Sequence, residues 1–356
     1  MRRVAPAMGL FLLAPFVGEF LLGNLRLDEL ALGLILAPMY GAGALLIREV
    51  ARRTGRGWPT MVLLAIAYAL MEEGPIDQLL WNDSYAGHDL LHGDSYIPAL
   101  GMSVELTVAI VALHAVWSIC VPIALVETIS NRRTTPWLRT PGFIVVVLVY
   151  LAGAVLVFLG NYSEERFIAT PWQITGVGLL IIALVIAAFR QPPLAPAAPG
   201  GGVGEGEESA ARPGAAVAPV GGVGAEVRSS RSALAGRAPA PWMVAGFALI
   251  ATSAYWGPST LIIAGWYEWV NVLAFCVVGG VGVLVIRGWS GLAGWGQGQV
   301  FGLAAGATLT YVWTAFPTVP ESGGSAAGDL VGNVVFGAVA LVVLGVGVRK
   351  VGTDHR

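Results

Sequence analysis

Long apolar runs recur along this 356-residue chain, and short stretches that carry most of the charged residues separate them. A helix needs about 20 apolar residues to cross a bilayer, and each run approaches that length. The pattern predicts an all-α fold: a polytopic transmembrane helical bundle of about ten spans. The predicted spans are residues 6–23, 30–48, 59–80, 103–127, 142–160, 172–189, 242–263, 268–286, 298–316 and 330–348.

Composition points to the same class. Hydrophobic residues make up 56% of the chain and charged residues only 12%, whereas about 25% of the residues of a soluble domain are charged. We therefore expect a multi-pass protein of the plasma membrane, with the lipid bilayer as its surroundings and an unidentified small solute or membrane substrate as its partner. The net charge of -2 gives no reason to expect nucleic acid. No Walker loop, nucleotide fingerprint or haem motif occurs, so no cofactor is predicted, and the sequence leaves the oligomeric state open.

Basic residues are concentrated in alternate loops. They precede the first predicted span and follow the second, fourth, sixth, eighth and tenth, whereas the loops at 81–102 and 317–329 contain none. Arg26 and Arg166 are exceptions, and each lies beside acidic residues. Since loops rich in Lys and Arg stay on the inner side of a membrane, both termini are predicted to be cytoplasmic.

The chain is predicted to divide in two. Residues 190–240 are rich in Pro, Gly and Ala and lack apolar periodicity, which predicts a disordered cytoplasmic linker. It separates a six-helix bundle, residues 1–189, from a four-helix bundle with a short cytoplasmic tail, residues 241–356. In the second bundle, a small-residue face for close helix packing is predicted at Gly298, Gly302 and Gly306.

Two adjacent glutamates, Glu72 and Glu73, lie inside the third predicted span. Acidic residues at membrane depth usually face the bundle interior or a wet cavity and have a function there. Two carboxylates this close cannot both ionise cheaply in a low dielectric, so we expect at least one of them to hold a proton. Such a pair suits a proton carrier or a general base. The alternative is that both lie near the outer interface, solvated by the loop that begins at Trp81.

Other polar residues of the first spans are candidates for the same site. His114 lies in the fourth span, where an imidazole either exchanges a proton near neutral pH or stays neutral and bonded to Ser118 or a carbonyl. Together with Thr107, these two residues form one polar stripe. We predict Glu72, Glu73 and His114 as the reactive groups. The predicted substrate or proton pathway consists of Glu19, Tyr40, Asp77 and Ser118.

Three further features have simpler interpretations. His88 and His92, in the loop after the third span, are spaced like metal ligands, but such loops are usually solvated and no metal is predicted. We interpret Arg48 and Arg52 as basic residues that fix the membrane topology at the cytoplasmic end of the second span. Glu127 reads as an interface residue at the end of the fourth.

Two resemblances extend this interpretation. The segments Gly18–Asn24, Tyr40–Glu49 and Glu72–Gly74 resemble an uncharacterised bacterial family of multi-pass membrane proteins, common in actinobacteria, which implies no known activity. Glu72 and Glu73, followed by His114-Ala-Val-Trp-Ser118, are similar to part of the pattern of the CAAX-protease and bacteriocin-processing (CPBP) intramembrane peptidases.

In the peptidase family, a Glu-Glu-x-x-x-Arg motif and two helix-borne histidines activate a water molecule. Here Asp77 stands at the position of that Arg, Ile110 stands where a Phe is expected, and the one later histidine is His355. The leading hypothesis is a proton-coupled carrier or a small-molecule or lipid-handling protein that uses a buried Glu/His site. The alternatives are a glutamate-type intramembrane hydrolase and a non-catalytic membrane scaffold.

Overall fold

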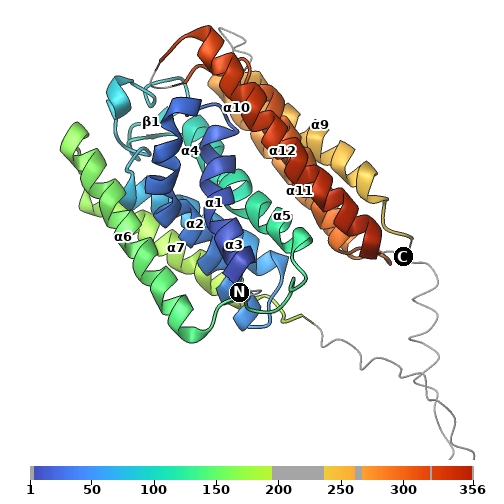
Figure 1. The fold of residues 1–356 in the computed structure, drawn as a ribbon. Helices are drawn as coiled ribbons and strands as arrows, with labels where there is room; N and C mark the ends of the chain where they lie inside the picture. Colours follow the sequence, from blue (N-terminus) through green and yellow to red (C-terminus); the bar gives the residue numbers. More distant parts are fainter. Residues whose placement is uncertain (1–3, 195–235, 261–266, 321–322, 355–356) are drawn as a thin grey trace, which may run out of the picture.

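The computed structural model describes residues 4–194, 236–260, 267–320 and 323–354, which form a bundle of long helices (Figure 1). The first part contains α1 (Val4–Pro15), η1 (Phe16–Phe20), η2 (Leu27–Glu29), α2 (Leu30–Arg53), α3 (Trp58–Met71), η3 (Glu72–Ile76), η4 (Tyr85–Gly87), β1 (Tyr96–Ile97), β2 (Met102–Ser103), α4 (Val104–Leu113), η5 (His114–Cys120), α5 (Val121–Ile129), α6 (Thr140–Glu165) and α7 (Pro171–Arg190). The second part contains α9 (Pro241–Thr260), α10 (Glu268–Ser290), α11 (Gln297–Thr314) and α12 (Ala326–Asp354). The segments η1, η3 and η5 are π-helical, and β1 pairs antiparallel with β2.

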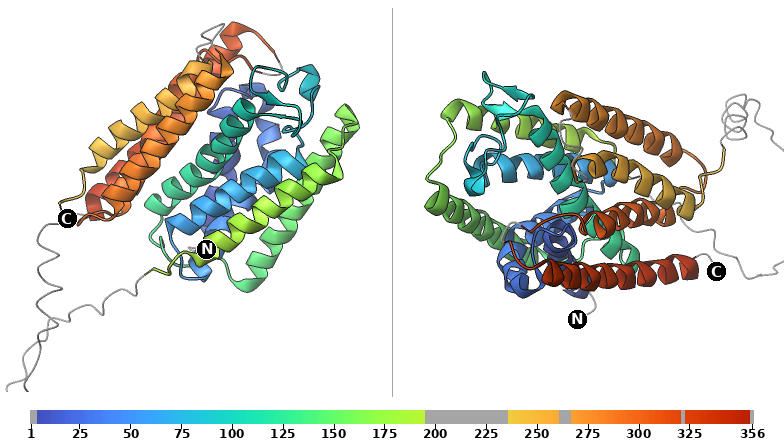
Figure 2. Two further views of the ribbon diagram at one scale, coloured as in Figure 1. Left: turned by 180° about the vertical axis from the view of Figure 1, so that it is seen from behind. Right: turned by 90° about the horizontal axis from the view of Figure 1, so that it is seen from above.

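Helices α9 to α12 lie along one side of the bundle, α6 and α7 lie along the other, and α1 to α5 lie between them (Figures 1 and 2). The described chain begins and ends at the same end of the bundle. The loop that carries β1 and β2 lies at the opposite end (Figure 1). An even number of crossings would give this arrangement, and the cytoplasmic placement of both termini stays a prediction.

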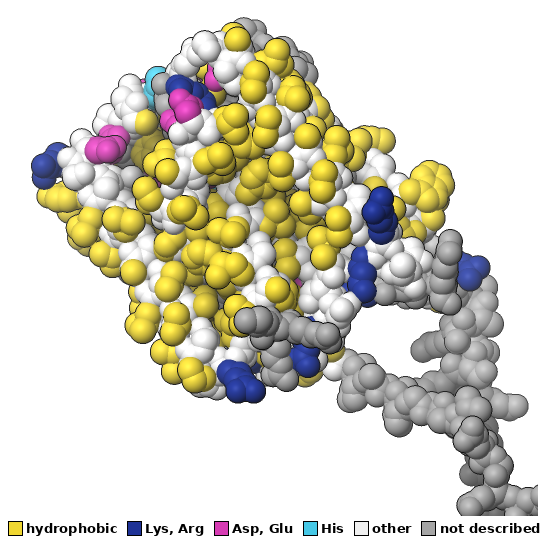
Figure 3. All heavy atoms as spheres, in the orientation of Figure 1, with side chains coloured by type: hydrophobic (Ala, Val, Ile, Leu, Met, Phe, Trp, Pro, Cys, Tyr) yellow, Lys and Arg dark blue, Asp and Glu magenta, His cyan; other side chains and the backbone are white. Residues whose placement is uncertain are grey.

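The surface of the bundle suits a membrane. Within the described residues, six helices are long and apolar enough to cross one: Leu27–Arg53, Val104–Ile129, Thr140–Glu165, Pro171–Arg190, Glu268–Ser290 and Ala326–Thr353. Hydrophobic side chains cover the middle of the face in Figure 3, and several Lys and Arg side chains gather at the end that carries the described termini. Each predicted span coincides with a helix over most of its described length. The count of ten crossings stays a prediction.

The third helix is shorter than predicted. It ends at Ile76 and not at residue 80, because Pro75 lacks a backbone donor and the backbone turns at Gln78, whose φ is 66°. The Gln78 side chain then accepts a hydrogen bond from the Ala169 backbone N–H at 2.7 Å. The loop at the end of the bundle opposite the described termini therefore begins right after Ile76.

The two predicted bundles share a hydrophobic core. One buried cluster joins residues of η1, η5 and α5 to residues of α11 and α12. At its centre the Trp117 ring stacks on Tyr311 at 4.6 Å, and its indole N–H donates to the Ala307 carbonyl at 2.9 Å. The division at the linker stays a prediction, and residues 195–235 of that linker lie outside the described residues.

Glycines on α11 allow its close contact with α9, as the sequence predicts. A Cβ atom at Gly302 would lie 2.5 Å from the Pro241 carbonyl oxygen. One at Gly306 would lie 2.4 Å from the Ala245 carbonyl oxygen. The small-residue face is therefore confirmed as a packing surface, because only glycine lets the two backbones approach this closely.

Candidate functional site

Three π-helical turns meet inside the first part of the bundle, and each carries predicted site residues. Turn η1 holds Glu19, η3 holds Glu72 and Glu73, and η5 holds His114 and Ser118. Such turns are rare and occur frequently at functional sites.

A proline adjoins each of these turns. Pro15 precedes η1, Pro75 lies inside η3 and Pro122 follows η5. Proline removes a backbone donor and crowds the carbonyl four residues earlier, so a wider turn relieves the clash. Pro75 and Pro122 crowd the carbonyls of Met71 and Ser118, beside η3 and within η5, and so account for the widening of those two turns.

The Glu–His cluster, defined here as Glu72, Glu73 and His114, is the centre of this site. The imidazole lies between the two carboxylates: Nδ1 is 3.1 Å from Glu72 Oε2, and Nε2 is 2.7 Å from Glu73 Oε1. Ser118 Oγ lies 3.2 Å from the same Nδ1. The two glutamates are 1% exposed and the histidine 4%, so the cluster is shielded from lipid and water alike.

Glu19 and Tyr40 lie beside this cluster. The Tyr40 hydroxyl donates to Glu19 Oε1 at 2.5 Å, and the Tyr40 ring is 5.7 Å from the His114 ring. Gly18 fits between them, since a Cβ there would lie 2.9 Å from Ser118 Oγ and 3.3 Å from the Tyr40 ring. The structure therefore brings Glu19, Tyr40 and Ser118 next to the Glu–His cluster.

Several polar atoms at the cluster lack a hydrogen-bond partner in the described part of the chain. They are Oε1 of Glu72, Oε2 of Glu73 and the Tyr68 hydroxyl, whereas Oε2 of Glu72 faces His114 Nδ1. Tyr68 is one helical turn before Glu72, close enough for an electrostatic interaction between the two, and its ring packs against Gly43. Buried polar atoms are almost always hydrogen-bonded, so a set of exceptions at one place marks a site that binds something further.

Asp77 and Thr107 lie apart from the cluster. The Asp77 carboxylate accepts hydrogen bonds from the Tyr85 hydroxyl at 2.9 and 3.0 Å and from the Asn161 amide. The Thr107 hydroxyl donates to the Ser103 carbonyl at 2.6 Å. Asp77 therefore ties the loop at 81–102 to α6. It makes no hydrogen bond to the Glu–His cluster among the described contacts, but its carboxylate interacts electrostatically with all three members of the cluster, and its part in a proton pathway stays a prediction.

His88 and His92, in the loop at 81–102, do not form a metal-ligand cluster among the described residues. His92 Nδ1 lies 3.0 Å from the Asp89 carboxylate, and His88 is exposed. Backbone N–H groups of His92 and Leu91 hold the pKa of Asp89 below its usual range. In the part of the chain that the structure describes, the group with metal-ligand types in reach of one another is Glu72, Glu73 and His114, with one ligand atom from each within 4.8 Å of the others.

A second buried polar cluster lies at the opposite end of the same helices. Arg48 and Glu127 are 0% exposed. Glu127 accepts from Arg48 Nε at 3.0 Å and from Arg52 Nη2 at 2.6 Å, and Arg48 Nη1 donates to Glu49 at 2.6 Å. The interpretation of Glu127 as an interface residue was wrong, because the fold pairs it with two guanidinium groups inside the protein.

This cluster also holds the loop after α5. Arg48 Nη2 donates to the carbonyls of Arg132, Arg133 and Thr135 at 3.2, 3.0 and 2.8 Å. The guanidinium lies 3.6 Å from the Trp137 ring centroid. Arg48 is thus more than a topology anchor, since it ties this loop to the end of α2.

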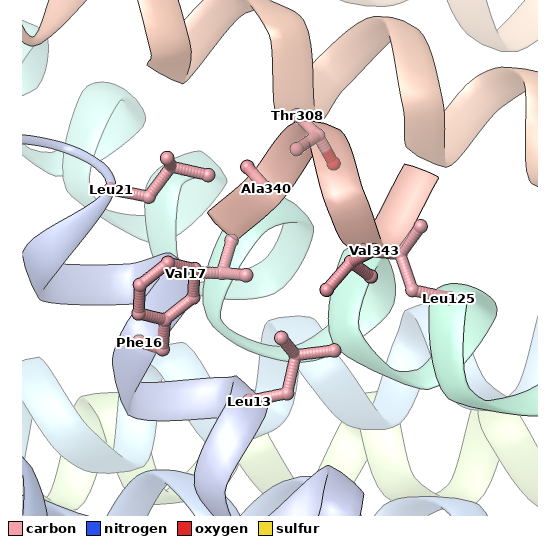
Figure 4. Close-up of a pocket in the computed structure, with 8 residues that line it drawn as sticks. All are labelled: Leu13, Phe16, Val17, Leu21, Leu125, Thr308, Ala340 and Val343. Atoms are coloured by element: carbon pink, nitrogen blue, oxygen red, sulfur yellow. The ribbon is translucent and has the colours of Figure 1, made fainter. Parts of the chain in front are cut away.

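Two hydrophobic hollows elsewhere in the described part of the chain take no part in the site. A crevice between α1, η1, α5, α11 and α12 (Figure 4) has only one polar side chain in its lining. Its lining residues are Leu13, Phe16, Val17, Leu21, Leu125, Thr308, Ala340 and Val343. A groove between α9 and α10 is wholly apolar. Neither includes a residue of the Glu–His cluster.

Sequence reasoning missed the π-helical turns and the charge cluster around Arg48. The signal for the first was the proline that adjoins each of these turns, Pro15, Pro75 and Pro122. The signal for the second was the presence of acids, Glu49 and Glu127, at helix ends rich in arginine.

Comparison with known proteins places the chain in a broad class. A family model described as an uncharacterized membrane protein family matches residues 10–343, nearly the whole chain. The comparisons with curated proteins and with solved structures gave no match. The resemblance to the CPBP peptidases therefore gains no support from them.

Proposed function

Because this chain belongs to that family of membrane proteins, we propose that it is a carrier that takes up and releases protons at the Glu–His cluster while it moves a small solute. The observation that carries the proposal is the His114 ring held between two buried carboxylates, at 3.1 and 2.7 Å. Ionisable groups inside a membrane bundle mark ion pathways and proton relays.

The geometry suits proton exchange. A carboxylate oxygen and a bare ring nitrogen are both acceptors, so each of the two contacts requires a proton on one of its atoms. Between Glu72 Oε2 and His114 Nδ1 that proton can move from one partner to the other without displacement of heavy atoms. Ser118 Oγ, at 3.2 Å from Nδ1, keeps the ring oriented.

The three π-helical turns supply a means of conformational change. Each holds one residue more than an α-helical turn, and its return to α geometry would rotate the following side chains by about 100°. Because Glu19, Glu72, Glu73 and His114 all lie on such turns, a change of charge in the cluster would act directly on the helices that hold it.

The burial of the cluster on all sides agrees with one stage of a transport cycle. Gly18 covers Ser118 on one side, and the Arg48–Glu127 contacts tie the helices together at the end of the bundle that carries the described termini. A carrier that alternates access passes through a state closed to both sides.

A hydrolase is the second candidate, and the contact between His114 Nε2 and Glu73 Oε1 favours it, because such a pair can also activate water. A reacting carbonyl would have to approach the same atoms. Ser118 Oγ is covered by the Gly18 backbone, which leaves no access for a peptide from that side. Cleavage of a membrane substrate that is lost in both Glu72→Gln and Glu73→Gln would favour the hydrolase over the carrier.

The test of the carrier uses the full chain in proteoliposomes with an internal pH-sensitive dye. With a mixture of low-mass cell solutes outside, the parent is expected to move protons faster than empty liposomes, and Glu73→Gln is expected to match empty liposomes. Glu105→Gln is the control, because Glu105 lies half-buried on the helix that leads to His114 and bonds Asn271 instead. Proton movement in Glu73→Gln at the parent's rate refutes the proposal.

A further inference from the structure

We infer that the Glu–His cluster binds a divalent transition-metal cation, which is the solute that the carrier moves. The inference rests on the proposed carrier function and names the cargo of the same site. It is drawn from the donor atoms, their charges and the unpartnered oxygens around them.

The unpartnered oxygens point to a missing positive partner. Glu72 Oε1 and Glu73 Oε2 are buried and have no hydrogen-bond partner in the described residues, and each glutamate is 1% exposed. A buried carboxylate is strongly unfavourable unless it is paired or coordinates a metal. His114 offers at most one positive charge, which cannot balance two carboxylates.

Charge arithmetic favours a divalent ion. Two ionised glutamates and one neutral imidazole carry two negative charges, and a divalent cation neutralises the set completely. Around this cluster lie the hydroxyls of Tyr40, Tyr68 and Ser118. The two further carboxylates nearby have partners of their own: Glu19 accepts from Tyr40, and Asp77 accepts from Tyr85 and Asn161. No Lys or Arg is paired with Glu72 or Glu73 in the described ion pairs.

The donor types select the class of metal. One ligand atom from each of Glu72, Glu73 and His114 lies within 4.8 Å of the others. Imidazole nitrogen with carboxylate oxygens suits zinc and its first-row neighbours, whereas calcium and magnesium prefer oxygen ligands alone. The remaining coordination positions stay open to water or to the Tyr68 hydroxyl, which suits a cargo that must also be released.

Ser118 would orient the His114 ring without binding the metal itself. In metal sites, the second ring nitrogen of a ligating histidine is usually held by a hydrogen bond, which fixes the ring. Ser118 Oγ, at 3.2 Å from His114 Nδ1, stands where such a partner is needed. The metal would then be held by Nε2, which faces Glu73 Oε1 at 2.7 Å, and it would replace the proton that this contact requires.

The first experiment measures binding apart from transport. The purified, tag-free full chain in detergent is titrated with Zn²⁺ against a chromophoric chelator. One Zn²⁺ per chain is expected, with affinity at least about 10-fold lower in Glu72→Gln and in Glu73→Gln and unchanged in His92→Ala, which removes an exposed loop histidine. Affinity in both glutamine variants equal to the parent, or loss of binding in His92→Ala, overturns the site.

A second measurement needs no variant and so holds even where a variant fails to fold. X-ray absorption at the zinc edge of the loaded parent is expected to give one imidazole and otherwise oxygen ligands. A shell with sulfur or with several imidazoles overturns the assignment.

Zn²⁺ flux in proteoliposomes, followed with an internal fluorescent zinc indicator, then tests the cargo role. Flux in the parent that is absent in Glu73→Gln supports it. Proton movement that depends on Glu73 without zinc binding would leave the carrier intact and overturn this inference. Zinc binding without flux of zinc or protons would overturn the carrier and the cargo role together.

Discussion

Loss of Glu127 is expected to destabilise the bundle more than loss of any exposed acid, and the size of the effect follows from its surroundings. Glu127 is 0% exposed and lies 3.0 Å from Arg48 Nε and 2.6 Å from Arg52 Nη2. Glu127→Gln keeps the shape of the side chain but removes its charge. Arg52 then has no acid left among the described ion pairs, and Arg48 keeps Glu49, which Arg53 also contacts.

Removing one partner of a buried ion pair costs about 3–5 kcal/mol, because the other charge is left uncompensated. Arg48 keeps its three backbone carbonyl acceptors, so the expected value for Glu127→Gln lies near the lower limit, about 3 kcal/mol. Exposed ion pairs contribute about 0–1 kcal/mol by comparison.

The assay is reversible unfolding of the reconstituted chain by SDS titration, followed by tryptophan fluorescence. Trp137 gives a local signal, since Arg48 lies over its ring at 3.6 Å. Glu164→Gln serves as the control, because Glu164 is exposed at the end of α6.

The double variant Arg52→Gln/Glu127→Gln, compared with the two single variants, gives the interaction energy between Arg52 and Glu127 apart from their contacts with other residues. The two groups are in contact, so their effects should be non-additive, with a coupling of about 0.5–3 kcal/mol. A loss in Glu127→Gln of less than about 1 kcal/mol, equal to that in Glu164→Gln, would contradict the reasoning. The network would then contribute nothing beyond a surface ion pair.

Two further predictions concern packing and the outer loop. Gly306→Ala is expected to destabilise the bundle by about 1–3 kcal/mol through overpacking, because its Cβ would lie 2.4 Å from a backbone oxygen of α9. Gly279→Ala is the control: a Cβ at Gly279 would meet nothing within 4 Å, so no loss of stability is expected. The same SDS titration checks this, and equal stability of the two variants would refute it. In the loop at 81–102, the backbone N–H groups of His92 and Leu91 lower the pKa of Asp89. The local stabilisation that this gives is complete above the unfolded pKa of Asp89, 3.8, and is lost as the pH falls through the lower pKa of the folded state. The protection factors of those two amides, which compare their exchange with the intrinsic rate at each pH, should therefore stay constant from neutral pH down and fall only in strong acid; a fall already between pH 7 and 5 would contradict it.

Much of the fold follows from local pattern. The apolar runs predicted where helices lie, because the hydrocarbon length and the 1.5 Å rise of a helix fix how many residues a span needs. The third helix is an instructive exception: the pattern continued to residue 80, while the helix ends at Ile76. Apolarity alone does not record that Pro75 and the left-handed Gln78 stop a helix.

The candidate site was predicted in part for a similar reason. Glu72, Glu73 and His114 stand out because ionisable residues are costly at membrane depth, and that cost can be read from sequence. Asp77 stood out by the same rule, yet the fold gives it Tyr85 and Asn161 as partners. The rule identifies residues that need a partner and does not say which partner they find.

The sequence by itself determined that this is a helical membrane protein, and it marked Glu72, Glu73 and His114 as candidates for one site. Only the tertiary structure decided that the Glu72 and Glu73 carboxylates meet the His114 ring, at 3.1 and 2.7 Å, and that Glu127 meets Arg48 and Arg52. The physical reason is range. Hydrophobicity and proline act on the residues around them, whereas these contacts join helices tens of residues apart, which meet only when the bundle packs.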